Sequence, residues 1–547
     1  MDDAQLASRS QWLHPVLNAE EAVAWEVRLF NGDHDSEEAA LRQAGEALGT
    51  AILRDFNECA PLPRDPRLLV LAGKGHNTGD ALVAARTILK TRPRGSLVIL
   101  FALGETTVRP LVQTVLAELL QDFGAQTHLH YLVENADEAD VSKILAQLAR
   151  DCGGRFDLCL DGILGMRFRP PVRPPVDALL HAVNRSPDIV LRAAVDLPSG
   201  AHPRMDTHVP HFRADLTYAT GIAKNALFDQ PRPVSFGRIR YLDLGFFDGE
   251  RPVTLDSARP HIITDSVLAR LAEPRPADTD KRHYGHLFVI AGSRAMPGAA
   301  LMNVRAALKV GVGLVTAFVP ESIQPAFAAA CPEAMWVPCP ETPDGHLARS
   351  TWAMIEPRMG RADALLMGSG LGQHCETRKL LRDLIADYGD RLVLDADALH
   401  PELLETFDDD ASQCELTPHL GEFRRLTQAE AAGTNEEILE FVSRWNDNAL
   451  TCLLKGSVTR ISDGDHLACL LAGGPVQARG GTGDLLAGII AALLAMDTNR
   501  PGFEAACLGA HWLGRAAQAL ARARGETAVT TIEVLDYLHV PLREFHR

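Results

Sequence analysis

Residues 478–495, ARGGTGDLLAGIIAALLA, join a cluster of glycines to a long apolar run. The run predicts a buried helix. Because Gly480, Gly481 and Gly483 precede it, the first backbone N–H groups of the helix are free to bind an anion at the positive end of its dipole. The stretch therefore predicts an anion hole for a phosphate group, with Asp484 at its mouth as a general base or a polar anchor. A simple helix-capping role for Asp484 is the alternative.

A second glycine loop lies in residues 71–86, LAGKGHNTGDALVAAR. It has the order strand, glycine turn, helix, in which Gly73, Gly75 and Gly79 permit a tight turn and a close approach to an anion. The acidic residue that ends the second strand of a classical dinucleotide-binding fold is not clearly present, so redox use of NAD is not favoured. The two glycine loops share only a Thr-Gly-Asp string, and we therefore expect two different nucleotide-facing sites on two folds.

Strand-like and helix-like patterns alternate along the whole chain, which favours an α/β protein with largely parallel sheets. In the first half, strands are predicted over residues 67–73, 96–103, 156–163, 189–197 and 214–220. In the second half, they are predicted over residues 286–292, 314–320, 364–370, 391–398, 414–419 and 451–457. The clearest helical patterns are residues 80–90, 299–311, 483–495 and 503–523.

Domain organisation follows from length and from one linker. A chain of 547 residues is expected to form roughly two to four domains. The Pro-rich and charged stretch LAEPRPADTDKRHYGH, within residues 260–285, separates two complete alternating patterns. We therefore predict one domain over residues 1–262 and a second over residues 263–547.

Composition excludes several classes of function. The net charge of -17 leaves no positive surplus for general nucleic-acid binding. The N-terminus lacks a basic and an apolar signal region, and the longest apolar run, Leu485 to Met496, is too short to span a bilayer. The ten cysteines form no CxxC pair and are interpreted as small core residues of a reduced, cytoplasmic protein. We expect small-molecule substrates and neither a nucleic-acid nor a membrane partner.

Three oxygen-bearing side chains lie near predicted strand ends in the first domain. They are Asn77, Asp161 and Ser199, and the carboxyl ends of parallel strands meet at one edge of a sheet. An amide, a carboxylate and a hydroxyl suit a hard cation, because no sulfur or imidazole is present to favour zinc. Ordinary turn and cap roles for these three residues are the alternative.

Residues from about 15 to 250 resemble the YjeF N-terminal family, the NAD(P)H-hydrate epimerases, which have a Rossmann-like three-layer fold. The resemblance rests on HNTGDA at 76–81, DGILG at 161–165 and DLPSG at 196–200. It implies that K⁺ is held by Asn77, Asp161 and Ser199. It also implies that the substrate lies against two loops and one strand end, namely His76, Asn77, Thr78, Gly79, Asp80, Gly165, Met166, Arg167 and Asp196, with Lys224 facing the same pocket.

This chain departs from the motifs of that family at several positions. His76, Thr78 and Ala81 stand where the family has Asn, Gly and Gly, and GMRFRPPVR replaces the usual Gly-Thr-Gly segment. The sequence does not identify the side chain that moves protons in the epimerisation. Asp196 is our first candidate for this catalytic role.

Polar residues also follow the predicted strands of the second domain. Asp395 and Asp397 end LVLDADAL, His419 lies in LTPHLGEF, and Lys455 follows an apolar strand. With the glycine loop at 480–483, these segments converge on one crevice at the carboxyl ends of the strands. Structural roles for His419 and Lys455 are the alternative.

From about Lys281 to Ala521 the chain resembles the YjeF C-terminal family, the ADP-dependent NAD(P)H-hydrate dehydratases of the ribokinase-like fold. The motifs are KVGVGLVT, LVLDADAL, LTPHLGEF, LLKGSVT and GGTGDLLAGII. The resemblance implies that the hydrated nucleotide contacts Ala299, Gly370, His419 and Asp484. It implies that ADP or AMP contacts Lys455, Gly456, Ser457, Val458, Thr459 and Gly483. Ser369 stands where the family usually has Pro.

Together the two resemblances imply a bifunctional enzyme that repairs hydrated NAD(P)H. The first domain would interconvert the R and S epimers, and the second would dehydrate the S form with Mg²⁺ and ADP, giving AMP and phosphate, with Asp484 as catalytic base. Two alternatives stay open. One is a small-molecule kinase, and the other is a dehydratase whose first domain is a non-catalytic binding module. Homo-oligomerisation also stays open.

Overall fold

The structure is a computed structural model that describes residues 11–104, 108–202, 209–228, 234–249, 259–388, 391–407, 413–445 and 449–545. These residues form two compact units. The first, the N-terminal unit, contains residues 15–249 and 521–525. The second, the C-terminal unit, contains residues 11–14, 259–520 and 526–545.

The N-terminal unit is built on one parallel sheet with the strand order β4-β3-β2-β5-β6-β7-β9. Its strands are β2 (Arg67–Ala72), β3 (Ser96–Phe101), β4 (Thr127–Tyr131), β5 (Phe156–Gly162), β6 (Ile189–Val195), β7 (Leu216–Thr220) and β9 (Arg238–Leu242). All adjacent pairs in this sheet are parallel. A short parallel pair, β1 (Leu13–Leu17) with β8 (Ala223–Lys224), lies apart from it.

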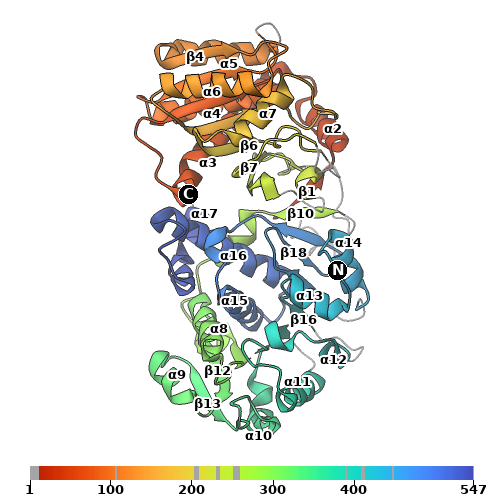
Figure 1. Cartoon of the computed structure of the whole chain (residues 1–547). Helices are drawn as coiled ribbons and strands as arrows, with labels where there is room; N and C mark the ends of the chain where they lie inside the picture. Colours follow the sequence, from red (N-terminus) through yellow and green to blue (C-terminus); the bar gives the residue numbers. More distant parts are fainter. Residues whose placement is uncertain are drawn as a thin grey trace. The chain divides into compact units, whose positions relative to one another are not determined.

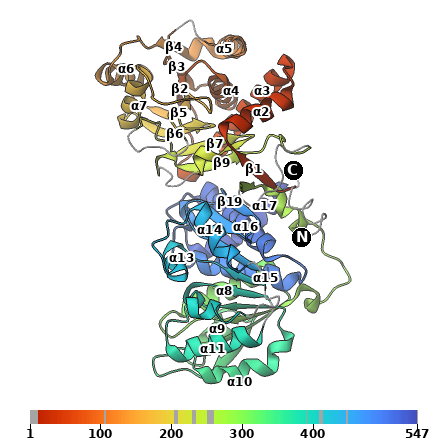
Figure 2. The same ribbon diagram turned by 90° about the vertical axis from the view of Figure 1, so that its right-hand side faces the viewer.

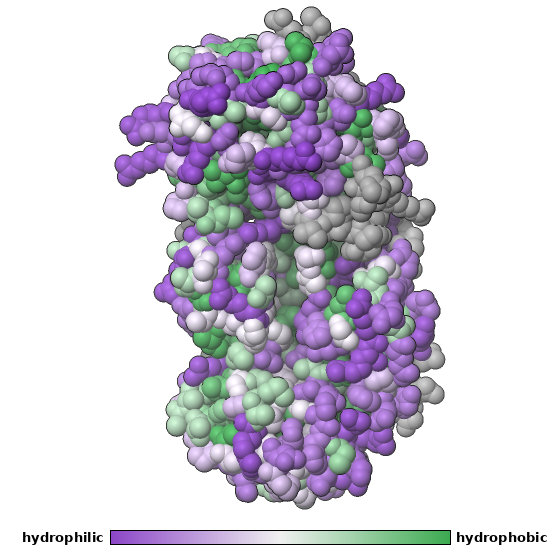
Figure 3. All heavy atoms as spheres, viewed as in Figure 1, coloured by the Kyte–Doolittle hydropathy of each residue, from purple (hydrophilic) through white to green (hydrophobic). Residues whose placement is uncertain are grey.

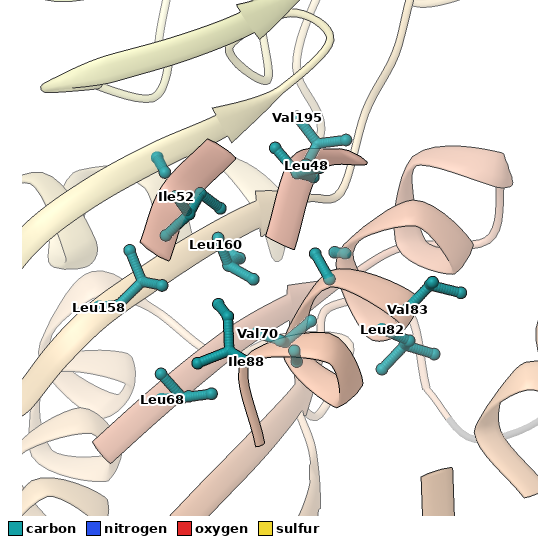
Figure 4. Close-up of a cluster of buried hydrophobic side chains, with 14 of the residues drawn as sticks. Leu48, Ile52, Leu68, Val70, Leu82, Val83, Ile88, Leu158, Leu160 and Val195 are labelled. Atoms are coloured by element: carbon teal, nitrogen blue, oxygen red, sulfur yellow. The ribbon is translucent and has the colours of Figure 1, made fainter. Parts of the chain in front are cut away.

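Helices cover both faces of this sheet (Figures 1 and 2). Alternate residues of β2 enter different cores: Leu68 and Val70 pack under α3 (His34–Cys59), α4 (His76–Thr91) and α5 (Pro110–Phe123). Leu69 and Leu71 pack under α6 (Glu138–Asp151) and α7 (Val176–Arg185). Figure 4 shows the first of these cores, in which Leu48, Ile52, Leu82, Val83 and Ile88 gather over Leu68, Val70, Leu158 and Leu160. The resemblance to the YjeF N-terminal family implied this three-layer α/β/α fold, in which strands covered on both faces are mostly apolar.

The C-terminal unit contains a larger mixed sheet with the order β13-β12-β11-β14-β15-β16-β17-β18-β19-β10. Its strands are β10 (Pro260–Ile263), β11 (His286–Ile290), β12 (Leu314–Pro320), β13 (Met335–Cys339), β14 (Ala364–Met367), β15 (Leu392–Leu394), β16 (Cys414–Leu416), β17 (Leu450–Leu454), β18 (Thr459–Ser462) and β19 (Leu467–Leu470). The strands from β13 to β17 are parallel, whereas β18 is antiparallel to both of its neighbours. The parallel part aligns the strand ends that carry the second candidate site.

Two helical layers enclose the sheet of the C-terminal unit. One contains α8 (Pro297–Val310), α15 (Thr482–Met496) and α16 (Gly502–Arg524). The other contains α11 (Cys375–Asp387), α13 (Leu420–Thr427) and α14 (Asn435–Ser443), whose apolar side chains share a core with β14 to β17. Helix α15 is buried almost throughout, since Leu485 to Ala495 are all buried. The central position of α15 places the glycine loop at 480–483 at the edge of the sheet.

The predicted strands and helices are all present, and the predicted α/β class is confirmed. The predicted domain boundary after residue 262 falls inside β10. That strand pairs with β19 and so belongs to the C-terminal unit, as do residues 11–14. The linker composition does not show that the short strand before it pairs with the sheet of the C-terminal unit.

The surface and the cysteines agree only in part with expectation. Hydrophilic side chains cover much of the face in Figure 3. No helix among the described residues is long and apolar enough to cross a membrane. Seven cysteines are buried, as predicted, but Cys59 and Cys375 are exposed and Cys152 is half-buried. For these three, the interpretation as core residues was wrong.

Candidate active sites

The N-terminal unit has a cavity of about 240 Å³ at the carboxyl ends of its parallel strands. Its walls come from α2 (Ala19–Phe30), α3, the start of α4, the loop after β5, the end of β6 and β8. Of the predicted substrate-contacting residues, it brings together His76, Asn77, Asp80, Gly165, Met166, Arg167 and Asp196, and Lys224 lines it as well. A crevice at the carboxyl ends of parallel strands is where α/β folds bind ligands.

Two predicted contacts, Thr78 and Gly79, do not line this cavity. Thr78 is fully buried, and its hydroxyl accepts a hydrogen bond from Gly73 N at 2.8 Å and donates one to Gly162 O at 2.8 Å. Gly79 faces Leu41 of α3, whose side chain leaves no room for a Cβ. Thr78 therefore ties the glycine turn to the end of β5, which gives its departure from the family motif a structural reason.

The three predicted cation ligands lie close together in the N-terminal unit. Ser199 donates from its backbone N to Asp161 Oδ2 at 2.7 Å and from Oγ to Asp161 Oδ1 at 2.6 Å. The Asn77 amide lies against the carbonyl oxygens of Leu164 and Val195, at 3.3 and 3.0 Å. Burial raises the pKa of Asp161 to about 6, while the bonds from Ser199 lower it. This oxygen-rich donor set fits a hard monovalent cation.

Asp196 and Lys224 form a buried ion pair. Lys224 Nζ lies 2.5 Å from Asp196 Oδ1, and both side chains are less than a tenth exposed. Asp196 has a left-handed backbone with φ 65°, and its backbone N donates to Tyr218 O at 2.8 Å. A non-glycine residue held in this conformation next to a cavity is typical of a functional site. Lys224, which matches the family motif, is therefore paired with Asp196, and the sequence did not predict this pairing.

Two further acids line the same cavity. Asp80 is only 8% exposed, and burial, followed by the charge of Asp196, raises its pKa well above the usual range. Glu26 on α2 has its pKa raised by burial as well, although its side chain is partly exposed. Sequence reasoning missed Glu26, because it lies far from the glycine loop along the chain and outside any motif.

In the C-terminal unit, the predicted residues follow the ends of adjacent parallel strands. Ala299 and Gly370 approach so closely that a Cβ at Gly370 would lie 2.8 Å from the Ala299 Cβ. His419 and Lys455 form an isolated parallel bridge beyond the ends of β16 and β17. A Cβ at Gly483 would lie 3.2 Å from Lys455 Nζ, so the glycine loop faces the same group. These predicted residues are therefore neighbours at one end of the sheet.

Asp395 links several of these strand ends through hydrogen bonds. Its carboxylate, which is buried, accepts hydrogen bonds from Ser369 Oγ at 2.9 Å, Thr417 Oγ1 at 2.8 Å and Lys455 Nζ at 3.2 Å. Ser369, which departs from the family pattern, thus gives the carboxylate one of its donors. Asp397 lies aside and accepts from the backbone N of Gly372 and from the side chain of Gln373.

Asp484 lies in the first turn of α15, after Gly481, which caps the helix with φ 90° and no side-chain cap bond. The Asp484 carboxylate makes no hydrogen bond to another described residue, so the capping alternative finds no support. Burial raises its pKa to about 6, and the negative charge of Asp395 adds to this while Lys455 opposes it. Asn303 of α8 fixes its backbone by donating to Asp484 O at 2.8 Å. A carboxylate with this pKa is suited to accept a proton near neutral pH.

His419 has a structural role in addition to the predicted one. Its Nδ1 accepts from the backbone N of Gly421 and Glu422, which caps α13, and Glu422 returns a bond to His419 N at 2.7 Å. Because Nδ1 is the acceptor, the proton of the neutral ring lies on Nε2. The side chain is about 60% exposed, and its Nε2 lies 3.3 Å from Glu422 Oε1.

The predicted nucleotide-binding residues form the turn between β17 and β18. Lys455 N donates to Pro418 O at 2.8 Å, and Gly456 and Thr459 close the turn through two bonds of 3.4 Å. Val458 is buried and anchors the turn, whereas Gly456 and Ser457 are exposed. Lys455, the first residue of this turn, is the one that approaches the glycine loop at Gly483.

Comparison with known proteins gives matches to both units. A family model described as NAD(P)H-hydrate dehydratase matches residues 287–539, and the model of the YjeF-related protein N-terminus matches residues 37–226. The chain is 32% identical to a bifunctional NAD(P)H-hydrate repair enzyme of Moorella thermoacetica over 485 residues, 87% of each chain. It is 33% identical to the enzyme of the same name from Gloeobacter violaceus, over 88% of each chain.

Solved structures similar to part of this chain include an ADP/ATP-dependent NAD(P)H-hydrate dehydratase from Bacillus subtilis that was co-crystallised with ATP and Mg²⁺. That similarity covers 52% of this chain and 98% of the other, at 25% identity and a TM-score of 0.41.

Proposed function

The chain belongs to the family of bifunctional NAD(P)H-hydrate repair enzymes, and we propose that each of its two units performs one step of that repair. The N-terminal unit interconverts the R and S epimers of hydrated NADH or NADPH. The C-terminal unit dehydrates the S epimer and consumes ADP. Small molecules are thus the substrates of both units, and we keep the cytoplasmic location expected from the sequence as part of this proposal.

The observation that carries the dehydratase proposal is the half-buried Asp484 carboxylate at the glycine-led start of α15. Hydroxide is a poor leaving group, and phosphate is a good one. Asp484 accepts the hydroxyl proton while the hydroxyl oxygen bonds to the terminal phosphorus of ADP and AMP departs. The backbone N–H groups at 480–483 stabilise the charge on the transferring group. The nitrogen of the nicotinamide ring then expels phosphate from the carbon, and loss of a proton from the adjacent ring carbon to water restores the C=C bond of NAD(P)H.

The remaining predicted contacts bind the two substrates. Ala299, Gly370 and His419 hold the hydrated nicotinamide nucleotide. The turn at 455–459 and Gly483 hold the adenine nucleotide, and Lys455 is placed to contact its phosphates. Among the described residues no group of three or more His, Cys, Asp or Glu side chains could hold a metal. Mg²⁺ would arrive bound to the phosphates of the nucleotide and would neutralise part of their charge.

The epimerase proposal rests on the cavity above Asp196 and Lys224 and on the oxygen cluster of Asn77, Asp161 and Ser199. K⁺ bound by these three residues would fix the loop that carries Gly165 and Met166 against the glycine turn. The cation supplies positive charge and rigidity at the edge of the cavity. His76, Asn77, Asp80 and the 165–167 loop then surround the hydrated ring.

The proposal is tested with separate epimers. Pure S epimer of NADH hydrate, incubated with the full chain, ADP and Mg²⁺, should regain the absorbance of reduced nicotinamide, and pure R epimer should convert to S without ADP. No ADP-dependent recovery would contradict the dehydratase assignment and favour a small-molecule kinase. Recovery from S without conversion of R, beyond the spontaneous rate, would make the N-terminal unit a binding module.

A further inference from the structure

We propose that Asp80, and not Asp196, is the catalytic acid that carries the proton in epimerisation. This inference rests on the proposed epimerase function of the N-terminal unit. It corrects our first candidate from the sequence, and it gives a chemical role to a residue that the motifs place only against the substrate.

Among the described acids of this cavity that have no hydrogen-bond or ion-pair partner, Asp80 is the buried one. Its side chain is more than nine-tenths buried and lines the cavity from α4. It makes no hydrogen bond or ion pair with any residue that the structure describes. The two neighbouring buried acids differ in this respect, since Asp161 accepts bonds from Ser199 and Asp196 is bonded to Lys224. An unpartnered buried carboxyl group is stable only when it is protonated.

The charges that face Asp80 come from several elements. Glu26 of α2, Asp196 after β6 and Lys224 of β8 act on it directly. Around the rim of the cavity lie Glu37 of α3, His76 of α4, Arg109 before α5 and Arg167 of the loop after β5. Lys224, the cation that acts on Asp80 directly, is paired with Asp196 at 2.5 Å. Burial and the two acids therefore raise the pKa of Asp80 well above that of a free carboxyl group.

Asp196 is unsuited to deliver a proton. Its Oδ1 already accepts a hydrogen bond from Lys224 Nζ at 2.5 Å, so this carboxylate is occupied by another buried side chain. Its function is then to hold Lys224 in place. The ion pair provides a fixed polar surrounding for the positive charge that develops on the ring. Glu26 is the remaining rival, but its side chain is partly exposed, so solvent stabilises its ionised form better than that of Asp80.

In the proposed step, water leaves one ring carbon and then returns to it. The Asp80 carboxyl group donates its proton to the hydroxyl oxygen, the C–O bond breaks, and water leaves. The lone pair of the ring nitrogen forms a C=N bond, so that the carbon becomes planar. Water adds to the opposite face of this carbon, and its extra proton returns to the Asp80 carboxylate. No oxidant, reductant or additional reactant is needed.

The test uses the full chain with Asp80→Asn, with Glu26→Gln as the loss of another cavity acid, and with Glu46→Gln of α3 as a control outside the cavity. Conversion of pure R epimer is followed by chromatography without ADP, so that dehydration does not interfere. We expect kcat for Asp80→Asn to fall about 100-fold or more with KM changed little, because general acid catalysis contributes about 10²–10⁴-fold. Glu46→Gln should stay within about threefold of wild type, since its side chain is exposed and does not line the cavity.

A pH profile and a thermal melt separate this role from a structural one. Wild-type kcat/KM for epimerisation should fall as pH rises through the pKa of Asp80, and Asp80→Asn should remove that limb. Because Asp80 is protonated when folded and ionised when unfolded, folding loses stability as pH rises above about 4, the pKa of the unfolded residue. The neutral amide avoids this loss, so Asp80→Asn should raise the melting temperature at pH 7, whereas Asp196→Asn should lower it.

Each outcome decides the proposal. Loss of kcat in Asp80→Asn with an intact melt supports it. Conversion within threefold of wild type, or a larger loss in Glu26→Gln than in Asp80→Asn, overturns it while leaving the epimerase function in place. A lowered melting temperature for Asp80→Asn also overturns it, because the residue would then be ionised or structurally required. Wild-type chain without any R-to-S conversion would instead refute the epimerase function itself.

Discussion

At the scale of single residues, Asp484 has the sharpest consequence for pH dependence. As a catalytic base it must be ionised, and its pKa in the folded chain is about 6. The kcat/KM for dehydration of the S epimer should therefore be level above about pH 7 and fall as pH drops through 6. Asp484→Asn should lower kcat about 10²–10⁴-fold. The measurement is ADP-dependent recovery of absorbance across pH 5 to 8.

The control for this prediction is Glu436→Gln, which removes an exposed acid from the first turn of α14. It should leave both the rate and the profile unchanged. An Asp484→Asn chain that kept its rate, or a wild-type profile with no acid limb, would show that another group accepts the proton.

Ser369 supports a second prediction about a single side chain. It donates to the buried Asp395 carboxylate at 2.9 Å, and a lost bond to a buried charged group costs about 1–3 kcal/mol. Ser369→Ala should lower the free energy of unfolding of the C-terminal unit by this amount in urea. Ser443→Ala, on the exposed face of α14, should change it by less than about 0.5 kcal/mol. Equal stability of the two variants would mean that Thr417 and Lys455 alone satisfy Asp395.

At the scale of elements, the packing of α15 on α8 positions Asp484. Gly488 of α15 lies against the backbone of Asn303, so closely that a Cβ would overlap the Asn303 carbonyl oxygen. The same Asn303 donates from its side chain to Asp484 O. Close contact between the two helices thus sets the position of the catalytic turn.

Gly488→Ala should therefore destabilise the C-terminal unit by about 1–3 kcal/mol, as overpacking in a core does, and it should also lower dehydratase kcat by moving α8 from α15. Gly298→Ala is the matched control on α8, since nothing lies within 4 Å of a Cβ there. It should be neutral or slightly stabilising, because Ala favours a helix by up to about 1 kcal/mol over Gly. Urea unfolding compares the two, and equal stabilities would refute the role of the close contact.

The elements differed in how well the sequence predicted them. Strands such as β2 and β11 are apolar runs that end at glycine, so their burial on both faces is visible in composition. The polar edge strand β4, THLHY, and the charged β9, RIRYL, lack such runs. The long helix α3 was missed although Leu41, Leu48 and Ile52 are spaced for one buried face.

The site residues also differed in how well the sequence predicted them. Asp80, Asp161, Asp395 and Asp484 could be found because each lies near a strand end or a glycine turn. The pairing of Lys224 with Asp196, and the presence of Glu26 in the cavity, depend on segments that fold together from distant parts of the chain. Because a motif records neighbours in sequence only, the choice between Asp196 and Asp80 as proton carrier required the structure.

At the scale of the whole molecule, each unit has its own hydrophobic cores and its own group of proposed site residues near the carboxyl ends of parallel strands. None of the residues argued for one reaction belongs to the unit that performs the other. The S epimer formed by the first unit can therefore reach the second through solvent, and two chains that each lack one site should complement one another.

This complementation is testable with Asp80→Asn and Asp484→Asn, once each has been shown to lack its own reaction. Either variant alone should leave a mixture of NADH-hydrate epimers incompletely repaired: the first stops near the S fraction, and the second regains no reduced nicotinamide. Their equimolar mixture with ADP, Mg²⁺ and K⁺ should repair both epimers at a rate within about twofold of wild type at equal concentration of each working site, because solvent exchange is fast compared with typical turnover of about 10 s⁻¹. Repair by the mixture many times slower than by wild-type chain would mean that the S epimer passes between the two sites of one chain without release.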